Sequence, residues 1–162
     1  MNYSKEQIEE FESYRHNLIG AVAKSVSPSI LQLFFDTKNG TPKATGCGVL
    51  FEIENNYFVI TAAHVPAEHS DTTYAVIGNN GVYLGGLMYF VALPMDKNRN
   101  ADKVDLAFVR LDPSTAEIIK KQHSFLTVED LQLGHQVNNK GQYLLFGYPA
   151  TKTRTKKVYQ ED

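Results

Sequence analysis

The stretch TGCGVLFEIENNYFVITAAHV, residues 45–65, decides which fold the sequence predicts. Two runs rich in β-branched and aromatic residues lie on either side of the polar residues ENN at 54–56. Such runs around a short polar turn predict a β-hairpin. In the first run Val49, Phe51 and Ile53 occupy alternate positions, which predicts that these three side chains share one buried face.

Several other short β-rich runs occur along the chain, and turn-forming residues separate them. They are SILQLFF at 29–35, TYAVI at 73–77, VYLGGLMYFVAL at 82–93, VDLAFVRL at 104–111 and QYLLFGYP at 142–149. Short strands at this spacing predict an all-β sandwich or barrel. Between the last two runs, residues 113–121 predict a short helix with Ser114 or Thr115 as its N-cap.

A longer helix is predicted near the start of the sequence. Ser4 followed by Gln7 has the spacing of a capping box. Apolar residues then recur at steps of three and four, at Ile8, Phe11, Tyr14, Leu18 and Val22. This periodicity predicts an amphipathic helix over residues 4–24, and we expect its apolar face to cover one end of the β-structure.

The composition excludes several classes of protein. The 162 residues are 43% hydrophobic and 21% charged, which excludes a disordered chain, a collagen-like repeat and a coiled coil. The net charge of −2 indicates neither a nucleic-acid nor a membrane partner. We interpret the basic residues at 152–157 as a solvated strand face. Cys47 is the sole cysteine, which favours a reducing compartment. Because no run resembles a secretory signal or a bilayer-spanning segment, the predicted location is cytoplasmic.

Two residues form the candidate site. His64 directly follows an apolar strand and two alanines, and a histidine acts as a general base when a partner fixes its tautomer. Asp105 opens the apolar run 104–111, where a carboxylate is costly unless a hydrogen-bonded partner meets it. The alternatives are a structural histidine at position 64 and a turn aspartate at position 105 that pairs with Lys103.

Cys47 offers two further hypotheses. As a nucleophile it would pair with His64, but we interpret it as a small buried hydrophobe. A metal site formed by Cys47, His64 and His69 lacks compact ligand spacing. We therefore expect neither a metal nor a cofactor.

A family resemblance rests on two blocks of this sequence. Residues 45–65 resemble the strand-turn-strand that leads to the catalytic histidine of trypsin-like (chymotrypsin-fold) serine peptidases of the bacterial type. KVDLAFVRL at 103–111 resembles the strand that opens with their catalytic aspartate. Gly46 and Gly48 fall where these peptidases have small residues that face the substrate cleft. FLTVEDLQLG at 125–134 and QYLLFGYPA at 142–150 look like the connection between their two barrels and the first strand of the second.

The resemblance covers roughly residues 26–150 and implies a mainly β fold, an antiparallel Greek-key β-barrel, which the predicted N-terminal helix precedes. The predicted division of the chain is a helix at 1–25 and a truncated peptidase domain at 26–162. Within that domain the first barrel extends to about residue 112, and residues 113–162 hold the connection and the first strand of the second barrel. We expect residues 147–162 to pack poorly, with Leu144, Leu145 and Phe146 uncovered.

The resemblance also implies a chemistry: peptide-bond hydrolysis through an acyl-enzyme, with His64 as general base and Asp105 orienting it, and with no cofactor. The nucleophilic serine of a glycine-rich turn is missing, since only Ser114 and Ser124 follow Asp105 and neither lies beside a glycine. We therefore expect the chain to be inactive alone, with a polypeptide as substrate or partner and with self-association through the incomplete second barrel. The alternatives are a non-catalytic domain that binds a peptide or protein, and a serine supplied by another chain.

Overall fold

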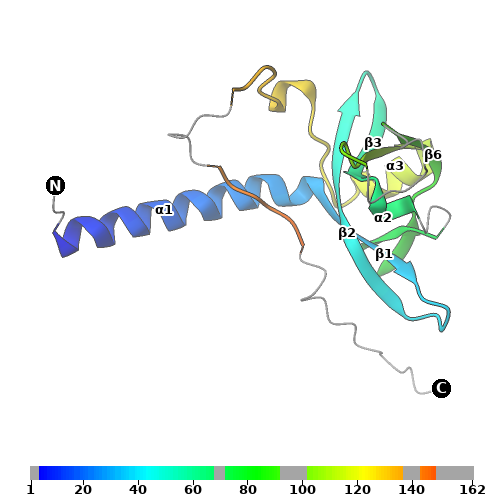
Figure 1. Ribbon diagram of the computed structural model, residues 1–162, viewed down its shortest axis with the longest axis horizontal. Coiled ribbons are helices and arrows are strands. Elements are labelled where there is room, and N and C mark those ends of the chain that lie inside the picture. The colour runs from blue at the N-terminus through cyan, green and yellow to red at the C-terminus, as the bar shows by residue number, and fades with distance from the viewer. Residues whose placement is uncertain (1–3, 68–71, 92–101, 137–142, 149–162) are drawn as a thin grey trace.

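One curled antiparallel sheet dominates the computed structural model of this chain (Figure 1). The structure describes residues 4–67, 72–91, 102–136 and 143–148. Within these ranges the sheet has seven strands in the order β5-β4-β1-β2-β3-β7-β6. The strands are β1 (Ile30–Asp36), β2 (Pro42–Ile53), β3 (Asn56–Ala62), β4 (Tyr74–Ile77), β5 (Asn80–Tyr83), β6 (Gly86–Phe90) and β7 (Leu106–Leu111). The prediction of a mainly β chain with an N-terminal helix is confirmed.

The predicted hairpin is β2 and β3, joined by a tight turn. Ile53 pairs with Asn56, and the two residues between them have positive φ angles, 49° at Glu54 and 62° at Asn55. Positive φ at both central positions is the conformation of the turns that match the twist of paired strands. Asn tolerates this conformation better than most residues do, so the sequence ENN suits the turn.

Of the three β2 side chains predicted to share a buried face, only Phe51 is buried. Leu50 is fully buried in the core, whereas Val49 is half-buried and Ile53 is 44% exposed. Phe51 is also buried, and a later segment pairs with the edge of β2 there, beyond the last residue that pairs with β1: Leu126 donates to the Leu50 carbonyl at 3.0 Å and accepts from Glu52 N at 2.7 Å. Burial on both faces removes the simple alternation on which the prediction depended.

The core lies inside the curl of the sheet. Its largest fully buried side chains include Leu31, Leu33, Leu50, Val59, Val109 and Ile119. Ile119 belongs to α3 (Pro113–Lys120), whose Thr115 and Ala116 are buried as well, so α3 contributes to the core. The residue that caps α3 is Asp112, whose Oδ1 accepts from Thr115 N at 2.7 Å. The prediction of Ser114 or Thr115 as the cap is wrong, because the aspartate one position before the helix accepts from both of them.

The long helix α1 (Lys5–Val26) forms as predicted, with Ser4 and Gln7 in a capping box. It does not cover the β-structure, because no α1 side chain is buried and Phe11 and Tyr14 are 53% and 66% exposed. Figure 1 shows α1 projecting away from the sheet. The short 3₁₀ helix η1 (Ser27–Ser29) connects it to β1. The predicted covering role is wrong, since the direction of a helix depends on its connection as well as on its apolar face.

Residues 143–148 form neither helix nor strand, so the strand predicted there is wrong within this range. A strand needs a neighbour to bond its backbone, and among the described residues no strand pairs its backbone with this segment. The expected exposure is found, because Leu145 is 98% and Leu144 is 44% exposed, while Phe146 is half-buried. The rest of the predicted poorly packed end, residues 149–162, lies outside the described residues.

Of the helices in the described ranges, none has both the length and the apolar character that crossing a lipid bilayer requires.

Candidate active site

The register of two neighbouring strands brings the predicted site residues to one end of the sheet. β3 and β7 pair antiparallel, with Ala62 opposite Leu106. His64 follows the end of β3, as the first residue of α2 (His64–Ala67), and Asp105 immediately precedes β7. Because antiparallel neighbours begin and end at the same edge, the two residues meet although they lie far apart in sequence.

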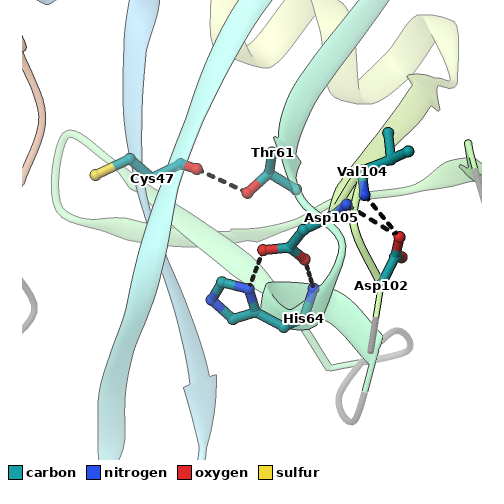
Figure 2. Close-up of polar contacts among 6 residues, drawn as sticks. All are labelled: Cys47, Thr61, His64, Asp102, Val104 and Asp105. Atoms are coloured by element: carbon teal, nitrogen blue, oxygen red, sulfur yellow. Dashed lines mark hydrogen bonds and ion pairs between the residues drawn. The ribbon is translucent and has the colours of Figure 1, made fainter. Parts of the chain in front are cut away.

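Both carboxylate oxygens of Asp105 contact His64 (Figure 2). Oδ2 lies 2.7 Å from His64 Nδ1, and Oδ1 accepts from the His64 backbone N–H at 3.0 Å. The Asp105 carbonyl accepts from Ala63 N at 3.0 Å. The predicted proximity of His64 and Asp105 is therefore found, and the carboxylate fixes both the ring and the backbone of the histidine. Their catalytic roles stay a prediction.

The hydrogen bonds also act on the carboxyl group of Asp105. Desolvation by burial raises its pKa, but the hydrogen bonds from the His64 side chain and backbone more than offset this, so the pKa is lowered from its usual value. Asp105 is therefore ionised at neutral pH. A carboxylate beside Nδ1 favours the tautomer that carries its proton on Nδ1.

The other ring nitrogen, Nε2, is available to a reactant. The His64 side chain is 62% exposed, and no described residue hydrogen-bonds Nε2. With the proton held on Nδ1, the lone pair of Nε2 can accept a proton from a hydroxyl group. The arrangement is therefore suited to general-base chemistry.

Two glycines shape the strand beside His64. A Cβ atom at Gly46 would lie 2.7 Å from the Val65 side chain, and one at Gly48 would overlap Val59. Val65 is buried and follows His64 in α2. Gly46 therefore lets α2 pack against β2 and places the backbone of His64. The resemblance to peptidases predicted small residues at these two positions beside a cleft. In the structure the space beside them is filled by Val65 and Val59.

Cys47 does not join the site. Figure 2 shows its side chain pointing away from His64 and Asp105. The sulfur accepts from Tyr148 N at 3.0 Å and donates to the Tyr148 carbonyl at 3.3 Å, and the residue is half-buried rather than fully buried. Its own carbonyl accepts from Thr61 Oγ1 at 2.7 Å. The sulfur is thus occupied by the segment 143–148, which argues against a role as nucleophile.

The hydroxyl group of Ser114 and the metal-ligating side chains of the described residues lie apart from His64 or form no cluster. Ser114 Oγ donates to Asp112 at 2.7 Å, at the cap of α3 rather than at His64. The described residues contain no group of three His, Cys, Asp or Glu side chains that could hold a metal ion, and His69 lies outside the described ranges. The described part of the site is therefore a hydrogen-bonded histidine–aspartate pair.

One residue of this site escaped the sequence reasoning. Asp102 Oδ1 accepts from the backbone N–H groups of Val104 at 3.0 Å and Asp105 at 3.1 Å. An aspartate that precedes a turn by two or three residues commonly bonds the backbone in this way, so the sequence DKVD at 102–105 held the signal.

No protein-family model, curated protein or solved structure matches this chain. The geometry of the site and the sequence pattern are therefore the basis for its interpretation.

Proposed function

We propose that His64 and Asp105 are the general base and the orienting carboxylate of a serine-type endopeptidase domain of the trypsin-like kind. The observation that carries the proposal is the double contact of Asp105, with one oxygen 2.7 Å from His64 Nδ1 and the other 3.0 Å from the His64 backbone nitrogen. This arrangement holds the ring in one orientation and leaves Nε2 toward solvent. It matches the roles of histidine and aspartate in acyl transfer by a catalytic triad.

In the proposed reaction, Nε2 of His64 takes the proton of a serine hydroxyl as the oxygen attacks the carbonyl carbon of a peptide bond. Asp105 stabilises the imidazolium that forms, and the imidazolium then returns the proton to the leaving amine. Water hydrolyses the acyl-enzyme by the same proton transfers. The substrate is a polypeptide.

The order of the strands supports the same proposal. β1, β2 and β3 are joined consecutively, and β4 returns to lie beside β1, which gives the spatial order β4-β1-β2-β3. This is the order of a Greek-key unit. The resemblance of residues 45–65 and 103–111 to trypsin-like peptidases also supports the proposal.

The proposal requires a serine in a glycine-rich turn after Asp105, and residues 106–162 contain none, so a longer form of this polypeptide or a second chain would supply it. It also requires backbone N–H donors that stabilise the oxyanion of the tetrahedral intermediate. An isolated acid–base pair has little to act on, so the 162-residue chain alone is expected to be inactive. A domain that binds a peptide without cleaving it is the alternative, and the following experiment distinguishes the two.

The test is labelling by a fluorophosphonate probe together with cleavage of a peptide library. Sequencing the gene beyond the codon for Asp162 comes first, because a stop codon there supports the non-catalytic alternative. Both assays use the 162-residue chain and, where the reading frame continues, the complete gene product, each as wild type, His64→Ala and His123→Ala. His123 is the matched control, because it is a histidine whose Nδ1 contacts a different group: it lies 3.0 Å from the carbonyl of Pro28, in the 3₁₀ helix that precedes β1.

We expect the complete product to be labelled and to cleave peptides, with both activities lost in His64→Ala and kept in His123→Ala. The 162-residue chain should show neither. Cleavage that survives His64→Ala would contradict the proposal. Peptide binding by the complete product without labelling or cleavage would establish the non-catalytic alternative.

A further inference from the structure

Asp105 has an unusual backbone conformation for the residue that begins a strand. Its φ angle is +41°, in the left-handed region. Residues other than glycine rarely adopt this region, although aspartate and asparagine are enriched there. Such a conformation persists only where surrounding contacts enforce it. The contacts around Asp105 therefore determine where its carboxylate points.

Hydrogen bonds fix the peptide groups on both sides of this residue, and Figure 2 shows those on the N-terminal side. On the N-terminal side, Asp102 Oδ1 accepts from Asp105 N at 3.1 Å and from Val104 N at 3.0 Å. On the C-terminal side, the Asp105 carbonyl accepts from Ala63 N at 3.0 Å. The C-terminal contact belongs to the sheet, where β7 pairs with β3. The N-terminal contact depends on a single side-chain oxygen, that of Asp102.

We propose that Asp102 is a positioning residue for the candidate active site: its Oδ1 holds Asp105 in the left-handed conformation that places both carboxylate oxygens on His64. This inference rests on the proposed function for its catalytic meaning. Its structural content, that Asp102 controls the His64–Asp105 hydrogen bond, can be tested without any cleavage.

The position of the Asp105 carboxylate depends on the backbone conformation of that residue. If the backbone of Asp105 relaxed to the common right-handed region, φ would change by roughly 100°. The carboxylate would then leave His64, because a hydrogen bond of 2.7 Å is lost once the two atoms are about 1 Å further apart. A displacement of about 1 Å in an active site can lower the rate by about 10²-fold.

Asp102 acts on Asp105 in two ways that a set of variants separates. Its charge raises the pKa of the Asp105 carboxyl, in opposition to the lowering by His64. Its oxygen holds the backbone. Asp102→Asn removes the charge and keeps the oxygen, since an amide also offers Oδ1 as an acceptor. Asp102→Glu keeps the charge and moves the oxygen outward by one methylene, and Asp102→Ala removes both.

The readout is the NMR signal of the His64 Nδ1 proton and the ¹⁵N shifts that report the tautomer, measured on the 162-residue chain. Asp130→Ala is the matched control, because Asp130 likewise accepts from a backbone N–H, that of Thr127 at 2.8 Å, in the exposed turn η3 (Val128–Asp130). Far-UV circular dichroism establishes that each variant is folded. In the complete gene product, kcat and KM for a peptide substrate are measured on the same variants.

We expect Asp102→Ala and Asp102→Glu to lose the hydrogen-bonded Nδ1 proton signal, and Asp102→Asn and Asp130→Ala to keep it. In the complete product kcat should fall by about 10²-fold for Asp102→Ala and recover in Asp102→Asn, with KM little changed. An intact Nδ1 signal in folded Asp102→Ala would overturn the inference. Should Asp102→Ala not fold, loss of the signal in Asp102→Asn, or its retention in Asp102→Glu, would overturn it equally. Absence of cleavage by the wild-type complete product would refute the proposed function. The NMR result on the 162-residue chain would then still decide the role of Asp102.

Discussion

Replacing Asp105 by asparagine tests the candidate site through the stability of the fold. Asparagine keeps Oδ1, which can still accept from the His64 backbone nitrogen, now 3.0 Å away. Its other terminal group is an amide donor, so it cannot accept the Nδ1 proton across the 2.7 Å contact. The substitution thus removes one charge-assisted hydrogen bond and leaves the shape of the side chain nearly unchanged.

The size of the effect follows from the exposure of the two side chains. A sheltered hydrogen bond to a charged group contributes about 1.5–3 kcal/mol. The side chains of His64 and Asp105 are 62% and 38% exposed, so solvent screening reduces their interaction toward the range of surface pairs, at most about 1 kcal/mol. We therefore expect Asp105→Asn to lower the free energy of unfolding by about 1 kcal/mol at neutral pH. For a domain of this size that corresponds to a melting temperature lower by about 2–4 °C.

The pH dependence gives the prediction its sign. The folded chain holds the pKa of Asp105 below the value of an unfolded aspartate, about 3.9. A group whose pKa is lowered by folding contributes its stabilisation above the unfolded pKa and loses it as pH falls through the folded pKa. The difference between wild type and Asp105→Asn should therefore be fully present at pH 5 and shrink toward zero as pH falls below 3.

Urea unfolding followed by circular dichroism, at pH 7, 5, 4 and 2.5, measures this difference. Asp130→Asn is the control, since Asp130 caps an exposed turn and is not part of the site. A difference between wild type and Asp105→Asn that stays constant or grows as the pH falls would refute the reasoning. So would equal stability of the two proteins at pH 7.

Three further predictions concern the rest of the molecule. Burial and the hydrogen bond to Asp36 raise the pKa of Tyr74 to about 12, so the folded chain should lose stability as pH rises from about 10 to 12. Urea titrations at alkaline pH should show a smaller loss for Tyr74→Phe. Combined replacement of Phe11 and Leu18 by serine should leave the hydrogen-exchange protection of the sheet unchanged, because no side chain of α1 is buried; reduced protection in β1 would contradict this. Gly48→Ala should destabilise the fold by about 1–3 kcal/mol in urea titrations, because its Cβ overlaps Val59, and adding Val59→Ala should recover part of that loss if overlap is the cause.

The local features of this protein could be predicted from the sequence because their causes are local. The hairpin of residues 45–65 depends on two β-rich runs and a turn whose asparagine tolerates positive φ. Likewise, Ser4 caps the start of α1, because the Ser4–Gln7 capping box needs only neighbours within one turn. His64 and Asp105 were identifiable because a carboxylate at the start of an apolar strand requires a partner, and the end of the neighbouring strand supplied one.

Other features depended on contacts between distant segments. Leu126 pairs with the edge of β2 at Phe51, which is buried although the neighbouring Leu50 is buried as well. The direction of α1 depends on the turn at Ser27–Ser29, and the lack of a strand at 143–148 reflects the absence of a paired neighbour among the described residues. A pattern of apolar residues specifies that a face will be buried, but not which segment will bury it.

The candidate site also has one part that the sequence predicts and one part that depends on the tertiary structure. The sequence predicted that His64 and Asp105 form the candidate site, because each follows or opens an apolar strand and both blocks resemble one family. Only the tertiary structure decided how the carboxylate is aimed, since that depends on the register of β3 with β7 and on the oxygen of Asp102 that holds Asp105 at a φ of +41°. A hydrogen bond changes steeply over a fraction of an ångström, and only the packed chain fixes positions to that precision.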